Sequence, residues 1–192
     1  MVSTAVAGAS VRYVIDTRAS QFTVQAFADG LISACAHSPK VAIREWTGEV
    51  QVAAGAMGSS ALKVRVKSAS LQVMDELKES ERHEIQRLMM IEVLETDRFP
   101  EIVYESSEVR LEKQKEDLYR ASVVGKLNLH GVTADQDFFS QVALGVDTAR
   151  AYGNFSLRQS DYKIPIASIA GGTLKLQDEL KFSFYVVARR QR

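Results

Sequence analysis

The sequence lacks features that several classes of protein need. One cysteine, Cys35, occurs in 192 residues, so an intrachain disulfide is excluded and the fold depends on its core. No apolar run approaches the roughly 18 residues that a membrane-spanning helix needs, because charged residues interrupt every hydrophobic stretch. Lys plus Arg and Asp plus Glu each number 24, so the chain lacks the overall basic field of a nucleic-acid-binding protein. We therefore expect neither a transmembrane segment nor a nucleic-acid partner.

The N-terminus also lacks the pattern of a secretory signal. Residues 1–11 contain no Lys or Arg ahead of a mildly apolar stretch of Ala, Val and Gly. We interpret residues 1–11 as a loose tail, and the default expectation is a cytoplasmic protein. Residues 12–190 are expected to form a single domain, because 46% apolar residues supply an ample core and no repeat or linker divides the segment.

Apolar and polar residues alternate with period 2 along most of the chain, which is typical of strands with one buried face. Turn signals such as Asp29-Gly30 and His130-Gly131 separate the alternating runs. The pattern predicts about eight antiparallel strands with short connections. The alternating runs include residues 22–26, 62–66, 102–104, 109–111, 119–129, 142–146, 155–157 and 180–186.

One segment departs from this alternation. Residues 75–95 are rich in helix formers and carry apolar residues at a spacing of three to four, which predicts a short helical segment. Asp75 and Ser80 are alternative N-caps for it. We expect the segment to close by Pro100, because the residue before a proline avoids the α region.

A sheet of about eight antiparallel strands must hide its apolar face, either by closing into a barrel or by folding into a sandwich. The single helical segment slightly favours a barrel, because it is suited to cap one mouth. The interior of an eight-stranded barrel is either packed with side chains or just large enough for one small ligand. Alternation does not decide between these, although filled interiors are the general rule.

Few polar residues suggest chemistry. Cys35 and His37 share one face of an extended segment, so a Cys–His pair or half of a metal site, with His130 as a further participant, is an enzymatic alternative. The structural interpretation, which we favour, is that Cys35 packs as a small apolar residue and His37 starts a turn before Pro39. We predict no catalytic residue, no metal site and no cofactor.

The aromatic residues on strand-like segments are more informative. Phe22, Trp46, Phe155, Phe182 and Phe184 lie among aliphatic residues, which suits either a dense core or the wall of an apolar cavity. From packing alone, a dense core is the first expectation.

Several stretches together resemble the YceI-like family, the polyisoprenoid-binding, lipocalin-like barrel proteins of bacteria. The most specific stretch is 125–133, GKLNLHGVT, which is similar to the family signature G-x-L-T-L-H-G-V-T. Two local differences from the family stand out. Residues 25–29 lack a histidine that many relatives carry, and the helical segment reads His83-Glu-Ile-Gln86 where relatives often have Asp-x-His-Leu. The similar segments follow the family order over about residues 12–188: 13–24, His37 with 46–50, 93–106, 125–133 and 155–164.

This resemblance implies a fold and a function. The fold is a mainly β, eight-stranded antiparallel lipocalin-like barrel with the helical segment, about residues 75–95, near one mouth. The function is binding, carriage or sequestration of a polyisoprenoid or fatty-acyl lipid in an elongated apolar tunnel, without catalysis. The resemblance thus reverses the preference for a dense core. The candidate ligand-contacting residues are Phe22, Trp46, Leu127, Phe155, Phe182 and Phe184.

Two other functions stay open at this point. One is a Cys/His or metal-dependent enzyme built on Cys35 and His37, and the other is a ligandless structural or interaction barrel with a filled interior. Whether the chain forms a homodimer is also open. Because the family is commonly exported, the periplasm or the exterior of the cell is the alternative to the cytoplasm.

Overall fold

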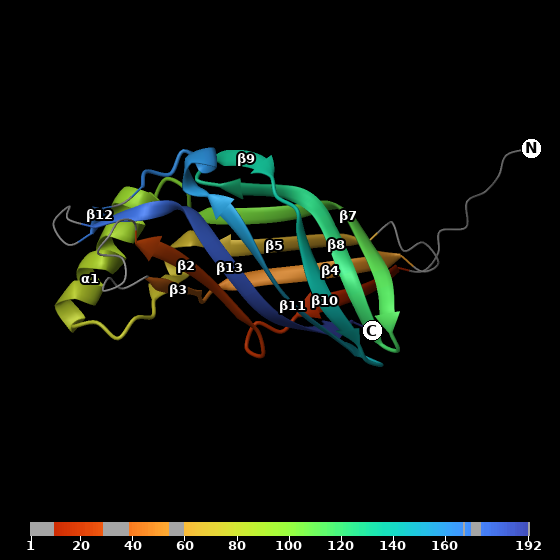
Figure 1. The fold of residues 1–192 in the computed structure, drawn as a ribbon. Coiled ribbons are helices and arrows are strands. Elements are labelled where there is room, and N and C mark those ends of the chain that lie inside the picture. Colours follow the sequence, from red (N-terminus) through yellow and green to blue (C-terminus); the bar gives the residue numbers. More distant parts are fainter. Residues whose placement is uncertain (1–9, 29–38, 54–59, 167, 170–173, 192) are drawn as a thin grey trace, which may run out of the picture.

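Strand pairing closes into a ring in the computed structural model, which describes residues 10–28, 39–53, 60–166, 168–169 and 174–191 (Figure 1). Within these residues, eight antiparallel strands follow one another around the ring, and the first returns to pair with the last through Tyr13 and Arg190. This confirms the predicted mainly β, eight-stranded antiparallel barrel. The ring strands are β1 (Ser10–Ile15), β4 (Trp46–Ala53), β5 (Ala61–Lys67), β7 (Glu101–Lys115), β8 (Leu118–Leu129), β10 (Phe138–Leu144), β11 (Thr148–Arg158) and β13 (Leu174–Arg190).

Three short strands extend the ring at one end. β2 (Gln21–Ala28) pairs with β13 and with β3 (Lys40–Ile43), and β3 pairs with β6 (Leu71–Val73). The strands β1 and β2, β3 and β4, and β5 and β6 are therefore the halves of three long, kinked strands. β9 (Val132–Asp135) and β12 (Ser168–Ile169) add short pairings to β8 and β13.

The kink between β1 and β2 is tied to the last strand. The Ser20 hydroxyl donates to the Asp16 carbonyl (2.7 Å) and accepts from the Val187 amide (2.9 Å). Arg189 donates to the Asp16 carboxylate at 3.0 Å. These contacts hold the first strand against β13 on both sides of its kink.

The hairpin between β8 and β9 explains why glycine stands in the most specific sequence motif. His130 and Gly131 form its two-residue turn, with φ values of 53° and 73°. Two consecutive residues with positive φ are the geometry of a tight hairpin turn that matches strand twist, and glycine adopts it without strain.

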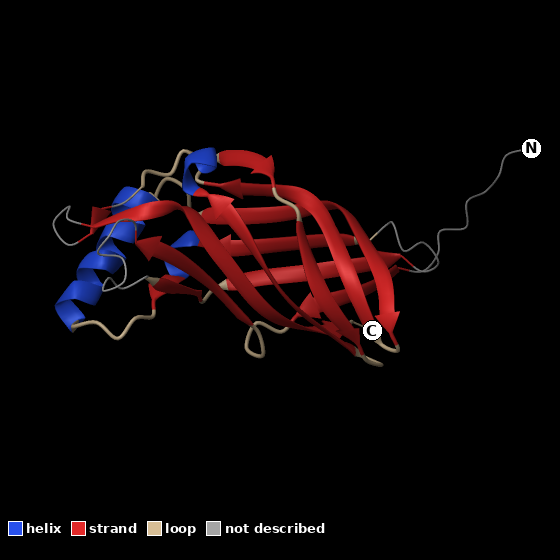
Figure 2. Ribbon diagram, viewed as in Figure 1, coloured by secondary structure: helices blue, strands red, loops and turns tan. Residues whose placement is uncertain are grey.

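A helical segment covers one mouth of the barrel, as predicted (Figure 2). It consists of α1 (Glu79–Leu88) and a π-helical turn over Met89–Val93. Both proposed N-caps are wrong, because Lys78 occupies that position without a side-chain cap. The Asp75 carboxylate instead accepts a hydrogen bond from the Lys40 amide at 2.9 Å and so secures β3.

The amide of Gln86 joins this helix to the free edge of β6. Its Oε1 accepts from the Val73 amide at 2.9 Å, and its Nε2 donates to the Leu71 carbonyl at 2.7 Å. The side chain therefore satisfies a strand edge in the way that a neighbouring strand would.

No helix of the described segments combines the length and the apolar character needed to cross a membrane.

Two boundaries differ from the sequence interpretation. β1 begins at Ser10, and Ser10 and Val11 pair with β4, so these two residues do not belong to the tail; residues 1–9 lie outside the described residues. Val146 lies in the turn after β10 and is 89% exposed, whereas the alternating run was expected to continue through it. A tight turn starting at Gly145 ends the alternation there.

We expect Gln86→Ala to lower the free energy of unfolding by about 1–3 kcal/mol, because both edge groups of β6 lose their partner in a partly buried position. Urea unfolding followed by fluorescence measures the change. Glu84→Ala, on the exposed side of the same helix, should cost less than about 0.5 kcal/mol. Equal losses for the two variants would show that the Gln86 hydrogen bonds do not hold the helix.

Candidate ligand cavity

The barrel encloses a cavity of about 330 Å³. It extends from Ile85 and Leu88 on α1, at the covered mouth, to Val52 and Leu144 near the opposite end. No charged residue lines it among the described residues. The volume lies within the range of pockets that hold small molecules. The lining is mostly apolar, and its polar members include Ser60, Tyr104, Gln136, Ser140 and Gln159.

Aromatic side chains form a belt around the inside of the barrel. Phe155 stacks on Phe182 with ring centroids 4.7 Å apart, and Phe22 meets the edge of Trp46 at 5.9 Å. Each contact of this kind adds to the burial energy of the rings. The belt consists of Trp46 on β4, Phe22 on β2, Phe182 and Phe184 on β13, Phe155 on β11, Phe138 on β10 and Tyr104 on β7.

The structure places every sequence-predicted site residue on the wall of this cavity. Five of them belong to the aromatic belt, and Leu127 lies opposite Tyr104 in the pairing of β7 with β8. Their contact with a ligand stays a prediction. The predicted residues that line the cavity are Phe22, Trp46, Leu127, Phe155, Phe182 and Phe184.

Sequence reasoning missed two members of the belt. Phe138 is followed by Phe139, so alternation alone did not show which ring faces inward; the structure turns Phe138 into the cavity and leaves Phe139 56% exposed. Tyr104 belonged to an alternating run with Ile102. Its inward position was thus visible, but its phenol was not considered as part of a wall.

Glycines on the inner face make room for two of these rings. A Cβ atom at Gly125 would lie 2.5 Å from the Tyr104 hydroxyl oxygen, and one at Gly153 would lie 2.7 Å from the Phe184 ring. Both distances are too short for any side chain. The two rings therefore lean over a neighbouring strand, which leaves space nearer the barrel axis.

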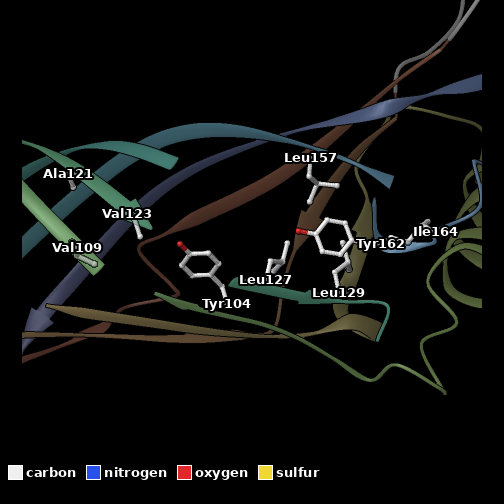
Figure 3. Close-up of a cluster of buried hydrophobic side chains, with 9 residues drawn as sticks. All are labelled: Tyr104, Val109, Ala121, Val123, Leu127, Leu129, Leu157, Tyr162 and Ile164. Carbon is white, nitrogen blue, oxygen red and sulfur yellow. The ribbon is translucent and has the colours of Figure 1, made fainter. Parts of the chain in front are cut away.

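Two buried tyrosine hydroxyls have no hydrogen-bond partner within the described part of the chain (Figure 3). Tyr104 lies among Val109, Val123 and Leu127, and burial with the nearby charge of Asp137 raises its pKa far above the ordinary value. Tyr162 belongs to the same buried cluster as Leu127 and Leu129, and burial first, then nearby carboxylates, raises its pKa as well. A buried hydroxyl without a partner stays protonated because its anion would lose hydration.

The residues of the enzymatic alternative are only partly visible. Cys35 and His37 lie outside the described residues. His130 packs against the Phe99 ring at a centroid distance of 4.4 Å, and its Nε2 lies 3.7 Å from the Glu95 carboxylate. Among the described residues, no three His, Cys, Asp or Glu side chains gather in a way that would hold a metal ion.

Comparison with known proteins agrees with this architecture. Residues 13–188 match the model of the YceI-like domain, which confirms the resemblance drawn from the sequence. A search of curated protein sequences gave no match.

Solved structures share the barrel at low sequence identity. BcnA of Burkholderia cenocepacia is 14% identical, with a TM-score of 0.69 over 90% of this chain and 98% of that chain. A polyisoprenoid binding domain from Saccharophagus degradans, implicated in plant cell wall breakdown, is 13% identical, with a TM-score of 0.67 over 93% and 98%. The Campylobacter jejuni YCEI protein is 15% identical, with a TM-score of 0.59 over 79% and 85%. At these identities the likeness establishes the fold.

The raised pKa of Tyr104 predicts a loss of stability in alkali. Tyrosines of the unfolded chain ionise near pH 10, so above about pH 10 the unfolded state binds fewer protons than the folded state. The free energy of unfolding should then fall by about 1.4 kcal/mol per pH unit for this residue. Tyr104→Phe should show a shallower fall above about pH 10 in urea unfolding. The same slope in both proteins would contradict the burial of a protonated hydroxyl.

Proposed function

Because this chain belongs to the YceI-like family, we propose that its barrel binds one long apolar lipid, a polyisoprenoid or fatty-acyl chain, and carries or sequesters it. The observation that carries the proposal is the cavity of about 330 Å³ whose described lining includes no charged residue. The relative from Saccharophagus degradans described as a polyisoprenoid binding domain supports the same class of ligand.

Burial energy argues for a long chain. Each methylene moved from water into an apolar site contributes about 0.8 kcal/mol, so about fifteen carbons contribute about 12 kcal/mol. Association costs roughly 4–15 kcal/mol because the ligand loses translational and rotational freedom. A chain much shorter than this would not stay bound in a site without charged anchors. Affinity should therefore come from chain length and not from a headgroup.

The proposal includes neither a catalytic step nor a cofactor. The alternative of a filled, ligandless barrel is disfavoured by the space inside the aromatic belt. The enzymatic alternative depends on Cys35 and His37. Reactivity of the thiol at neutral pH together with stoichiometric zinc in the purified protein would favour it over a carrier.

Native mass spectrometry of the freshly purified protein tests the proposal. We expect a mass that exceeds the denatured mass by one lipid, and the same molecule should extract into organic solvent. If the protein is empty, saturated fatty alcohols of increasing length should bind with about fourfold higher affinity per methylene until the cavity is full. An empty protein that binds none of them would overturn the proposal.

A variant that fills the cavity should abolish binding without unfolding the barrel. Ala151 is half-buried, lines the cavity and pairs with Val142 and Val186. In Ala151→Trp the indole would occupy the space that the lipid needs, so the lipid adduct should disappear from native mass spectra. Ala61→Trp adds the same side chain at an exposed position of β5 and should retain the adduct. Retention by both variants would place the ligand elsewhere.

A further inference from the structure

The outer wall of the barrel differs between its two halves. On β1, β4, β5 and β7, charges of opposite sign pair across neighbouring strands. Arg65 lies 3.2 Å from Glu101, and Lys67 lies 3.1 Å from Glu45 at the end of the same sheet. Further pairs on this half are Arg12 with Glu49 and Lys63 with Glu105. Ion pairs of this kind neutralise the surface locally.

The outward residues of the other half carry mostly cations. On β8, β10, β11 and the second part of β13, one set of alternate residues lines the cavity, so the other set faces outward. No Asp or Glu occurs among the outward residues over 120–128, 139–143, 148–158 and 181–189. The cations among them are Arg120, Lys126, Arg150, Arg158, Lys181 and Arg189.

Glu112 lies opposite Arg120 in the pairing of β7 with β8, and Glu179 lies two residues before Lys181 on β13, but neither carboxylate forms an ion pair with these cations. Lys126 pairs with Asp135, and Arg189 pairs with Asp16. Arg120, Arg150 and Lys181 form no ion pair with any other described residue. A protein of zero net charge therefore carries a positive region on this side.

Exposed aromatic rings lie among these cations. Phe139 and Tyr152 are each 56% exposed and Tyr185 is 41% exposed. Tyr152 and Tyr185 are directly paired between β11 and β13, and the Arg120 guanidinium lies 4.3 Å over the Phe139 ring. We call Phe139, Tyr152, Tyr185, Arg120 and Arg150 the aromatic-basic face.

We propose that the aromatic-basic face docks on lipid bilayers that contain anionic headgroups. Tyrosine rings, with an apolar body and a polar tip, favour the membrane–water interface, and unpaired arginines complement anionic lipid. The face is the convex outside of a barrel. A protein partner would need a concave surface that matches the barrel over the area of a typical protein–protein interface, whereas a fluid bilayer adapts to a convex surface. The inference goes beyond the proposed function, because it concerns the outer surface of the barrel and does not depend on which ligand the cavity binds.

Vesicle flotation tests this inference with two compositions, phosphatidylcholine alone and phosphatidylcholine mixed with phosphatidylglycerol. We expect binding to the mixed vesicles only, and weaker binding as salt is raised. Arg120→Gln with Arg150→Gln should weaken binding about thirtyfold, since each cation at an anionic surface strengthens association about fivefold. Phe139→Thr with Tyr152→Thr should weaken binding while leaving its salt dependence in place.

A matched control separates the face from overall charge. Arg65→Gln with Lys67→Gln removes the same two charges from the opposite half of the wall and should leave vesicle binding unchanged. Equal weakening by both pairs would overturn the proposal, because it would indicate attraction by net charge alone. Failure of the unaltered protein to float with anionic vesicles at low salt would also overturn it. So would a dimer that dissociates in Arg120→Gln with Arg150→Gln, since a second copy would then cover this face.

Discussion

Closure of the strand ring is the constraint on which the rest of the structure depends. The first strand closes the ring by pairing Tyr13 and Ile15 with β13, and the chain then bends. Ser20 and Asp16 hold this bend against β13 through Val187 and Arg189. The hydrogen bond from Arg189 keeps the pKa of Asp16 below its ordinary value, so the carboxylate stays charged as a partner throughout the neutral range. Closure leaves no long edge in the ring. The short edge that the kinked strands leave on β6 is covered by Gln86, which also fixes the helix over the mouth.

A closed ring of eight strands does not by itself leave a cavity, because side chains are able to fill an interior of this size. Here the space depends on pairs of large and small residues on neighbouring strands. The phenol of Tyr104 leans over Gly125, and the ring of Phe184 leans over Gly153. Alanines at 121, 149, 151 and 188 line the wall toward the end opposite the helix. The rings thus enclose apolar space without filling it, which is what a binding site for an uncharged chain requires.

Much of the fold was predictable from local sequence pattern. Alternation located most of the ring strands and their inward residues, although β1 and β4 were not among the alternating runs. Between the runs 102–104 and 109–111 the apolar positions change from even to odd residue numbers. The structure explains that change, because the pairing of β7 with β8 is irregular between Ser106 and Glu108. One extra residue in β7 brings the following apolar residues back to the inward face. The N-cap was not predictable, because the sequence does not distinguish an Asp that caps a helix from one that accepts a hydrogen bond elsewhere, as Asp75 does from the amide of Lys40. The hollow interior was not predictable from periodicity either, since alternation reports the face of a residue and not the space in front of it.

The two faces of one strand carry the two proposed interactions, and this explains why its register is strongly specified. In β11, Ala149, Ala151 and Phe155 line the cavity, while Arg150 and Tyr152 face outward. A shift of one residue would exchange these sets and place arginines in the apolar interior. Each unpaired buried charge costs several kcal/mol, which is a large fraction of the roughly 5–15 kcal/mol by which a domain is stable. The apolar cavity and the basic outer surface therefore require the same register of β11, and a shift by one residue would disrupt both.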